Sequence, residues 1–489
     1  MEATLVWLLP ALPALTALLL FVVRRPRRLA QVDVAASLAV FALALRLAWS
    51  VIRHGPIRAG LLGADAVSVV FVLLIGLLFA AASIYTVGWM PRELLHRGIR
   101  ERHLPLYYGL VHAFVATMLL TVLSDNLGVL WIAMEGTTIT SAILVGLHGH
   151  RYGLEAAWKY IIVTTIGISF GLFGTVLVYG AAAHAQGGVF AGAMNWSGIA
   201  PIARRLDPGI VRIGFIFVMV GYGTKAGLAP VHMWLPDAHS QAPTPVSALL
   251  SGALIKCALF GVIRFHTIAL GACGPEFSSG LLLAFGLVSV VVATPFILVQ
   301  HDLKRLLGYH SVEHVGIVAL GLGFGGRLGT YAALLHVVNH GVTKALVFLI
   351  AGDAIGRYGT RDMRAMRGFL GIAPLAGTLL LMGALSLAGT PPFSIFVSEL
   401  MVIQAGLAAG RTLTVAVFLA MVVIIFAGLI HHVGQMAFGA ADPAAERRRE
   451  ARSPLLGMLL LAAAMLALGL TIPARLDALL SRATEIILG

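Results

Sequence analysis

Charged residues are scarce in this 489-residue sequence and make up only 11% of the chain. Soluble domains carry about 25% charged residues, and disordered chains combine high charge with low hydrophobicity. Hydrophobic residues make up 59% of the chain, which excludes both of these classes. A single membrane anchor with a soluble catalytic head is also excluded, because apolar runs extend along the whole chain and leave only short loops.

Cysteine is nearly absent, with Cys257 and Cys273 as its only occurrences. Two cysteines exclude a disulfide framework and a cysteine-ligated iron–sulfur cluster, which needs four. The glycine-rich segment 321–326 ends an apolar run with no strand before it, so we expect a turn or close helix packing rather than a nucleotide loop. Energy must therefore come from an ion gradient or from partner subunits.

The sequence has a formal net charge of +13, but its distribution argues against nucleic-acid binding. The basic residues lie mostly in short loops beside apolar runs, as the positive-inside rule predicts for a membrane protein. The first run, residues 5–23, is preceded by Glu2 and followed by a basic cluster at 24–28. This order predicts an uncleaved first span whose N-terminus lies outside.

About 14 apolar stretches have the ~20 residues that a membrane-spanning helix needs. The candidate spans are residues 5–23, 32–50, 66–89, 105–123, 126–147, 156–183, 210–232, 243–265, 279–300, 309–325, 329–351, 373–409, 413–436 and 455–475. The sequence thus predicts an all-α, polytopic membrane protein. Most loop Lys and Arg fall on the side of the first loop, for example at 92–102 and 447–452, which places both termini outside.

Two spans contain helix-breaking residues, so we expect discontinuous helices at about 210–232 and 373–409. The first break contains Gly227 and Pro230, and the second contains Gly389, Pro391 and Pro392. The breaks are five spans apart, and this odd offset predicts two inverted five-helix repeats, as in many transporters. The predicted divisions are 1–104 (helices 1–3), 105–265 (first repeat, helices 4–8), 279–436 (second repeat, helices 9–13) and 455–489 (helix 14 and tail).

Five ionisable residues fall inside predicted spans: Glu135, Lys225, Lys256, Lys344 and Glu399. A central charge costs about 2.5–3.5 kcal/mol on insertion scales, so such residues are typically functional. Snorkelling or a structural ion pair would explain one lysine near a span end, but five central groups together indicate a functional pathway.

Histidines extend this set of buried groups. His336, His340 and Lys344 have the spacing i, i+4, i+8, which puts them on one helix face. His232 and His239 follow the break of the seventh span, and Glu313 lies near the start of the tenth, beside Ser311 and His314. Imidazoles titrate near neutral pH. The pattern therefore predicts a proton pathway across the midplane.

A zinc site at His336 and His340 is the competing interpretation, because two histidines four residues apart suit one helix face. The glutamate that follows the first histidine in zinc proteases is replaced by Val337, and no third ligand is evident. We therefore predict no metal site.

Residues 221–252, GYGTKAGLAPVHMWLPDAHSQAPTPVSALLSG, resemble the signature of the antiporter-like proton channels. That family comprises large membrane-arm subunits of respiratory complex I, Mrp-type Na⁺/H⁺ antiporter subunits and membrane subunits of group 4 hydrogenases. The resemblance covers most of residues 105–435. Segments 154–160 and 309–316 are most similar to component F of hydrogenase-4.

The resemblance implies a role for each buried group. Glu135 and Lys225 would form the coupled pair of the first half-channel, and Lys256 would be the central relay. His336, His340 and Lys344 would carry protons onward to Glu399 in the twelfth span. The two broken helices would be the hinges of the water path.

We therefore expect a proton-translocating membrane subunit of a redox-driven, hydrogenase-like or complex I-like complex in the bacterial cytoplasmic (inner) membrane. The resemblance implies no cofactor in this chain, with [NiFe] and Fe–S centres on partner subunits. The expected partners are other membrane-arm subunits, a peripheral redox arm, the lipid bilayer and protons, but no nucleic acid. Two alternatives stay open: an Mrp-type cation/proton antiporter subunit, and a membrane partner of a zinc enzyme in inorganic-carbon uptake.

Overall fold

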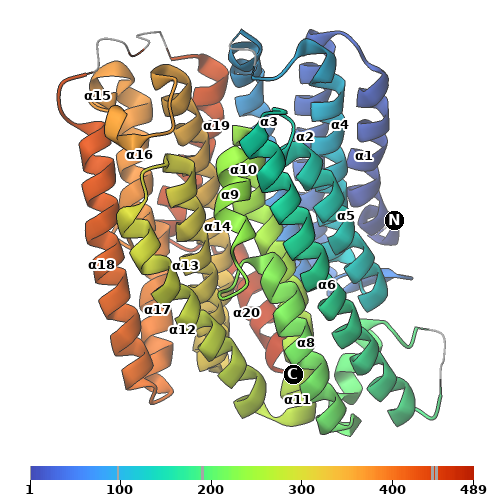
Figure 1. Ribbon diagram of the computed structural model, residues 1–489. Coiled ribbons are helices and arrows are strands. Elements are labelled where there is room, and N and C mark those ends of the chain that lie inside the picture. Colours follow the sequence, from blue (N-terminus) through green and yellow to red (C-terminus); the bar gives the residue numbers. More distant parts are fainter. Residues whose placement is uncertain (1, 96–97, 189–191, 442–444, 446–449) are drawn as a thin grey trace.

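The computed structural model describes residues 2–95, 98–188, 192–441, 445 and 450–489, and these residues are almost entirely helical (Figure 1). Within these ranges, 12 helices are long and apolar enough to cross a membrane. Strands β1 (Ile57–Ala59) and β2 (Leu62–Ala64) form one short antiparallel hairpin. The prediction of a helical, multi-pass membrane protein is confirmed.

The helices run in chain order from the N-terminal group through two larger groups to a C-terminal pair. The first eleven are α1 (Glu2–Val22), α2 (Pro26–His54), α3 (Ala66–Leu95), η1 (Glu101–His103), α4 (Leu104–Leu123), α5 (Leu127–Val145), α6 (Arg151–Ala185), α7 (Trp196–Ile199), η2 (Ala200–Arg205), α8 (Pro208–Ala226) and α9 (Trp234–Gln241). There follow α10 (Thr244–Leu249), η3 (Leu250–Leu254), α11 (Ile255–Cys273), α12 (Pro275–Val299), α13 (Leu303–Phe324), α14 (Gly326–Tyr358) and η4 (Met363–Ala365). The last are α15 (Phe369–Ile372), α16 (Pro374–Leu387), α17 (Ser394–Ala408), α18 (Thr412–Ala437), α19 (Arg452–Leu470) and α20 (Ala474–Leu488).

Both predicted breaks are present, and each is built around a glycine. Gly227 ends α8 in the left-handed region, with φ of 82°, and the chain becomes helical again at α9. Gly389 follows α16 with φ of 63°, and α17 begins at Ser394. Other residues adopt this backbone conformation only with strain, so glycine suits both positions.

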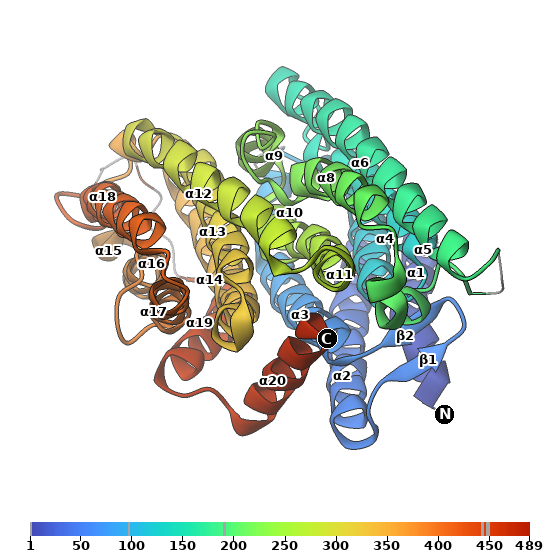
Figure 2. The same cartoon turned by 90° about the horizontal axis from the view of Figure 1, so that it is seen from below.

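The eighth predicted span is not a uniform α-helix. It consists of α10, the π-helical turn η3 and α11. The most apolar stretches of this segment and of α14 are fully buried, so the two form the centre of the molecule. Helices α12, α13 and α15 to α18 lie on one side of this centre and α4 to α8 on the other (Figures 1 and 2). The division into two inverted repeats stays a prediction.

The C-terminal helix α20 was expected only as a tail. Its buried residues Leu479, Leu480, Ala483 and Ile487 share one helix face, which packs on α2, α3, α11 and α14. Seen from below, α20 crosses the ends of these helices (Figure 2). Its polar residues also hold it in place, because the Tyr331 hydroxyl donates to Asp477 Oδ1 over 2.6 Å.

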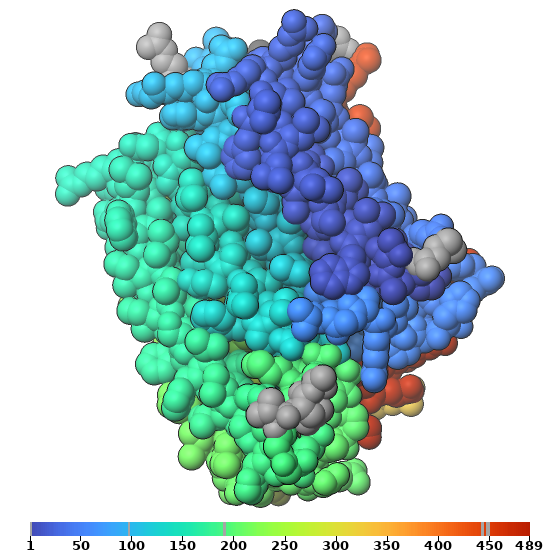
Figure 3. Space-filling view, turned by 90° about the vertical axis from the view of Figure 1, so that its right-hand side faces the viewer, coloured from blue at the N-terminus to red at the C-terminus, as the bar shows by residue number. Residues whose placement is uncertain are grey.

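The described parts of two loops that the sequence analysis assigned to one side, 92–95 with 98–102 and 357–367, lie at the same end of the bundle, the top in Figure 1. Of the third basic loop, 447–452, residues 447–449 lie outside the described residues. Figure 3 shows the face where α1 packs against α4. Trp158, Ile162, Ile166 and Phe170 of α6 are exposed, as expected for a surface that contacts lipid or another membrane subunit.

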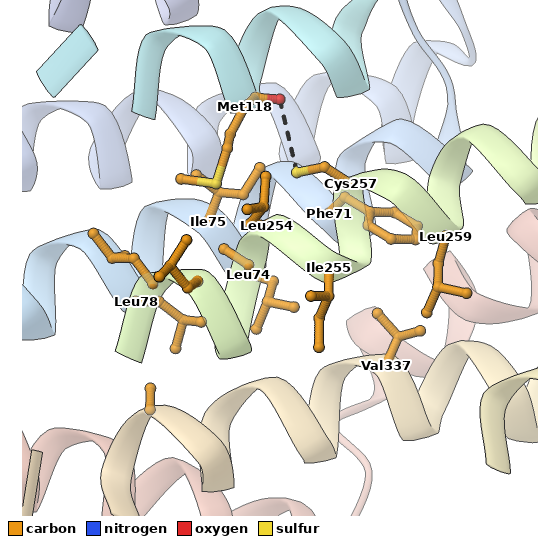
Figure 4. Close-up of a cluster of buried hydrophobic side chains, with 14 of the residues drawn as sticks. Phe71, Leu74, Ile75, Leu78, Met118, Leu254, Ile255, Cys257, Leu259 and Val337 are labelled. Carbon is orange, nitrogen blue, oxygen red and sulfur yellow. Dashed lines mark hydrogen bonds between the residues drawn. The ribbon is translucent and has the colours of Figure 1, made fainter. Parts of the chain in front are cut away.

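A cluster of buried apolar side chains separates the N-terminal helices from the centre (Figure 4). We call this cluster the apolar wall, and its members come from α3, α4, η3, α11 and α14. The wall comprises Phe71, Leu74, Ile75, Leu78, Met118, Leu254, Ile255, Cys257, Leu259 and Val337. Each of these side chains is at most 3% exposed, so the wall is closely packed.

Helices α6 and α8 approach each other through glycines. A Cβ added at Gly221 would lie 2.5 Å from the Gly171 Cα and 2.9 Å from the Gly167 carbonyl oxygen, both backbone atoms that do not yield easily. Gly221→Ala should therefore lower the free energy of unfolding by about 1–3 kcal/mol, as overpacking does in protein cores. The measurement is denaturation of the purified chain in detergent.

Gly180→Ala is the matched control, because an added Cβ there meets nothing within 4 Å on the same helix pair. This substitution should be neutral or slightly stabilising, since alanine is the better helix former. Equal stability of the Gly221→Ala variant and the parent chain would contradict the close packing of α6 on α8.

Candidate functional site

Lys225 is the centre of a first polar cluster in the membrane interior. Its Nζ donates to Thr138 Oγ1 and to the Tyr160 hydroxyl, both over 2.7 Å. Thr138 Oγ1 in turn lies 3.3 Å from Glu135 Oε2, and Thr165 Oγ1 donates to Glu135 Oε1 over 3.0 Å. The predicted pair of Glu135 and Lys225 is therefore joined through the Thr138 hydroxyl.

The local fold explains why an amine occupies this position. Lys225 lies in the last turn of α8, where the carbonyl end of the helix dipole favours a cation. Its Nζ is also 4.7 Å from the centre of the Tyr160 ring, within cation–π range. Lys225 is completely buried, whereas Glu135 is half-buried beside the outer face of α5 and α6. A change of charge outside this face would therefore affect Glu135 more directly than it affects Lys225.

Lys256 begins a second cluster at the π-helical turn. A π turn leaves backbone groups outside the usual α-helical pairing, and such turns are frequent at functional sites. The Nζ of Lys256 donates to the Ser251 carbonyl in this turn over 2.6 Å. It also lies 2.9 Å from His340 Nδ1 on α14. The amine is thus held between a carbonyl and an imidazole.

Histidines carry the second cluster from α14 to α13 and α17. The ring of His314 stacks on that of His340, with 4.5 Å between ring centres. His314 Nδ1 is 3.1 Å from His336 Nε2, and His336 Nδ1 is 3.0 Å from Ser398 Oγ. Glu399 Oε1 lies 3.8 Å from His314 Nδ1. Side chains of three helices therefore meet at the end of this row.

Lys344 and Glu313 lie along the same row but contact different partners. Lys344 Nζ donates to the Leu307 carbonyl over 2.7 Å, and Glu313 Oε2 lies 2.9 Å from His310 Nδ1. These groups are also withdrawn from solvent. The following ionisable side chains of α13 and α14 are at most 1% exposed: His310, Glu313, His314 and Lys344.

The structure brings His232 and His239 less close to this row. His239 packs between Trp234 and Phe348, and neither of its ring nitrogens has a hydrogen-bond partner in the described part of the protein. His232 lies near Tyr309, with 6.5 Å between ring centres. No hydrogen bond among the described residues links the Lys225 cluster to Lys256, so the site consists of two clusters.

Several ring nitrogens of the second cluster are also free to bind water. The Nε2 atoms of His310, His314 and His340 are buried and have no protein partner among the described residues. Buried polar groups that lack a protein partner are normally satisfied by ordered water. Water at these nitrogens would extend the row of proton donors and acceptors.

Sequence reasoning missed the hydroxyl and amide groups that join the charged residues. These are Thr138, Tyr160, Asn339 and Ser398, together with His310; His314 was noted beside Glu313 but was not among the predicted pathway residues. The sequence offered a signal for the histidines alone, because His310 and His314 are four residues apart around Glu313. Thr138, Asn339 and Ser398 are ordinary in composition, and only the packing of neighbouring helices reveals their contacts.

A separate buried pair lies in the N-terminal helices and was also missed. Asp33 Oδ1 on α2 lies 3.1 Å from His112 Nε2 on α4, and Ser83 Oγ of α3 donates to it over 3.0 Å. All three side chains are buried.

The chain also resembles known proteins. Residues 124–425 match the family described as NADH:quinone oxidoreductase/Mrp antiporter, transmembrane. The hydrogenase-4 component F homolog of Methylacidiphilum infernorum (isolate V4) is 35% identical over 412 residues, covering 84% of this chain and 85% of that protein. Hydrogenase-4 component B of Escherichia coli (strain K12) is 29% identical over 368 residues, 73% of this chain, which spans about half (52%) of that relative.

A solved structure shows the same fold over nearly the whole chain. A subunit of the membrane-bound sulfane sulfur reductase, an archaeal respiratory membrane complex, superposes with a TM-score of 0.88. The match covers 99% of this chain and 97% of that chain at 24% identity.

Proposed function

Because the chain belongs to the NADH:quinone oxidoreductase/Mrp antiporter family, we propose that it translocates protons as a membrane subunit of a redox-driven complex, hydrogenase-like or complex I-like. The observation that carries this proposal is the second cluster. An amine, three imidazoles and a carboxyl are joined by contacts across α11, α14, α13 and α17, from Lys256 through His340 and His314 to His336 and Glu399. Groups of this kind exchange protons in and near the physiological pH range.

The two clusters suggest how transport is coupled to an outside event. A change of charge near the half-buried Glu135 alters the electrostatic balance at Lys225, because Thr138 connects them within a medium of low dielectric constant. The charge on Lys225 then raises or lowers the proton affinity of Lys256. The histidines pass a proton that leaves Lys256 toward Glu399. In this proposal Lys344, Glu313, His232 and His239 are further stations, and the breaks at Gly227, Pro230, Gly389, Pro391 and Pro392 are the hinges.

The remaining parts of the proposal concern the surroundings of the chain. The end that carries the basic loops would face the cytoplasm, with both termini outside, in a bacterial inner membrane. The [NiFe] and Fe–S centres would lie on partner subunits of a peripheral arm, and other membrane-arm subunits would adjoin the chain. Residues 105–265 and 279–436 would form the two inverted repeats.

Substitution of Lys225 tests the coupling step. Lys225→Met keeps the length and packing of the side chain but removes the amine between Thr138 and Tyr160. We expect proton translocation by the assembled complex to fall about tenfold, the usual scale of coupling between two sites. The measurement is proton uptake into proteoliposomes that contain the whole complex, driven by its redox substrate.

Lys159→Met is the control, because this lysine lies on the surface and pairs with Glu155 at 2.6 Å. It should leave proton uptake unchanged. Full translocation by a correctly assembled Lys225→Met complex would refute the coupling role of the first cluster.

The cation/proton antiporter alternative makes a different prediction. Sodium prefers oxygen ligands, whereas four of the five groups from Lys256 to Glu399 present nitrogen. Transport should therefore proceed in sodium-free buffer at an undiminished rate. A strict sodium requirement would favour the antiporter.

A further inference from the structure

We propose that His314, His336 and Glu399 form a binding site for a divalent transition-metal ion of the zinc type. The three side chains come from three different helices, α13, α14 and α17, and all are buried. One donor atom from each lies within 4.8 Å of the other two. The proposal is based on this geometry and does not require that the chain transports protons.

The spacing of the donor atoms suits tetrahedral coordination. Zinc binds imidazole nitrogen at about 2.0–2.1 Å and carboxylate oxygen at about 2.0–2.2 Å, so neighbouring ligands of a tetrahedral ion are about 3.3–3.5 Å apart. The observed separations are 3.1 Å between His314 Nδ1 and His336 Nε2, and 3.8 Å between His314 Nδ1 and Glu399 Oε1. The third pair, His336 and Glu399, has donor atoms within 4.8 Å of each other. Small rotations of these side chains would bring the three atoms around one ion.

One histidine of the triad, His336, has the surroundings of a metal ligand. A metal-binding histidine usually has its second ring nitrogen fixed by a hydrogen-bonding group, which orients the ring. His336 meets this condition, because its Nδ1 lies 3.0 Å from Ser398 Oγ. Asn339 Nδ2 also donates to Ser398 Oγ over 3.2 Å, so the serine is itself held in position.

The second helix break lies beside the triad. The Glu399 carboxyl packs directly against Gly389 in the break between α16 and α17. Pro391 and Pro392 of the same break are exposed on the molecular surface. The break thus extends from the surface to a ligand of the proposed site, and its movement would admit an ion.

Protons and a metal ion would compete for the donor atoms of the triad, and nearby charges affect this competition. Glu399 and the nearby Glu313 favour a cation, whereas Lys256, in contact with His340, opposes a second positive charge. The imidazoles must be neutral to bind metal, so acid should weaken binding. Zinc would therefore bind to the same nitrogen and oxygen atoms that would carry protons along the row.

Metal binding to the purified full chain tests the proposal. We would titrate Zn²⁺ in equilibrium dialysis and record the absorption spectrum of bound Co²⁺, whose bands report the ligand set. The parent chain should bind one tight equivalent with two nitrogen ligands and one oxygen ligand from the protein. Ser398→Ala should weaken binding by about 10–100-fold, the usual effect of removing an outer partner. His336→Asn should weaken it at least as much.

Two controls make the result specific. His150→Asn removes an exposed histidine that stacks on His148, and it should leave tight binding unchanged. His336→Cys keeps a ligand but softens it, so it should raise the preference for Cd²⁺ over Zn²⁺ and show that a fold defect does not explain the loss in His336→Asn. Size-exclusion profiles of all variants report folding.

A neighbouring group, His310, Glu313 and His314, has the same donor geometry as the triad. Variants of the two groups therefore show which of them binds the ion. If His310→Asn abolishes tight binding and His336→Asn does not, the ion lies in the neighbouring group and the proposal is wrong. Absence of a tight equivalent in the parent chain would also overturn it. Proton uptake by the Lys225→Met complex tests the proposed function separately, because Lys225 belongs to the other cluster.

Discussion

Proton translocation by the assembled complex should fall at least about 100-fold when Lys256 is replaced by methionine. A positioned acid or base typically contributes about 10²–10⁴-fold to a proton-transfer step. The Lys256 amine contacts both the π-helical turn and the histidine row, through the Ser251 carbonyl and His340. Methionine fills the same space but carries no proton. The measurement is redox-driven proton uptake into proteoliposomes.

Cys257→Ala is the control for this prediction. Cys257 is the next residue of α11, and its thiol points away toward the Met118 carbonyl in the apolar wall, 4.0 Å away. The substitution changes a buried side chain of the same helix turn but no member of the row, so proton uptake should stay normal. Undiminished uptake in the Lys256→Met complex would show that protons cross by another route.

Asp65→Asn should lower the free energy of unfolding by about 3–5 kcal/mol, because it leaves the buried Arg264 guanidinium without its counter-charge. Arg264 NH1 and NH2 contact the two Asp65 carboxylate oxygens at 2.7 and 2.9 Å. The guanidinium is held between the rings of Trp196 and Phe260, 4.2 and 4.7 Å from their centres. Chemical denaturation in detergent measures the change.

Glu485→Gln provides a matched comparison at the surface. Glu485 pairs with Arg327 at 3.4 Å, but both side chains are more than half exposed. Exposed pairs contribute about 0–1 kcal/mol, so this variant should be nearly as stable as the parent. Similar losses in the two variants would mean that burial does not strengthen the Asp65–Arg264 pair.

Acid should remove the same contribution in the parent chain. Burial alone would raise the pKa of Asp65, but the Arg264 guanidinium and hydrogen bonds from Ser68 outweigh it and lower this pKa below its ordinary value. A carboxyl with a lowered folded-state pKa stabilises the fold above its unfolded pKa of about 3.9, and the contribution disappears as pH falls through the folded value. The stability gap between parent and Asp65→Asn should therefore close in strong acid.

The sequence predicted those features that depend on single helices. Glycine and proline located both breaks, and helical spacing placed His336 and His340 on one face with Lys344. Contacts between helices could not be predicted in this way, because they depend on how α5, α6 and α8, or α13, α14 and α17, pack together. The Thr138 bridge and the approach of Glu399 to His314 belong to this group.

Helix ends and local irregularities were the other source of error. The second predicted span begins at residue 32, and Asp33 was not counted among the ionisable residues inside spans. The helix in fact begins at Pro26, which is suited to a first turn, and Asp33 is buried inside the bundle. The π-helical turn before Lys256 cannot be recognised from the pattern of hydrophobic residues, which is the same as in an α-helix. The amphipathic α20 is too polar to be recognised as a span.

The side chains of the apolar wall are hydrocarbon apart from the sulfur atoms of Met118 and Cys257. Such a surface offers a proton almost no hydrogen-bonding atoms along which to hop, so the wall is a barrier to proton movement between α3 and α14. In the proposed pathway, this barrier would keep protons of the histidine row from crossing toward the N-terminal helices.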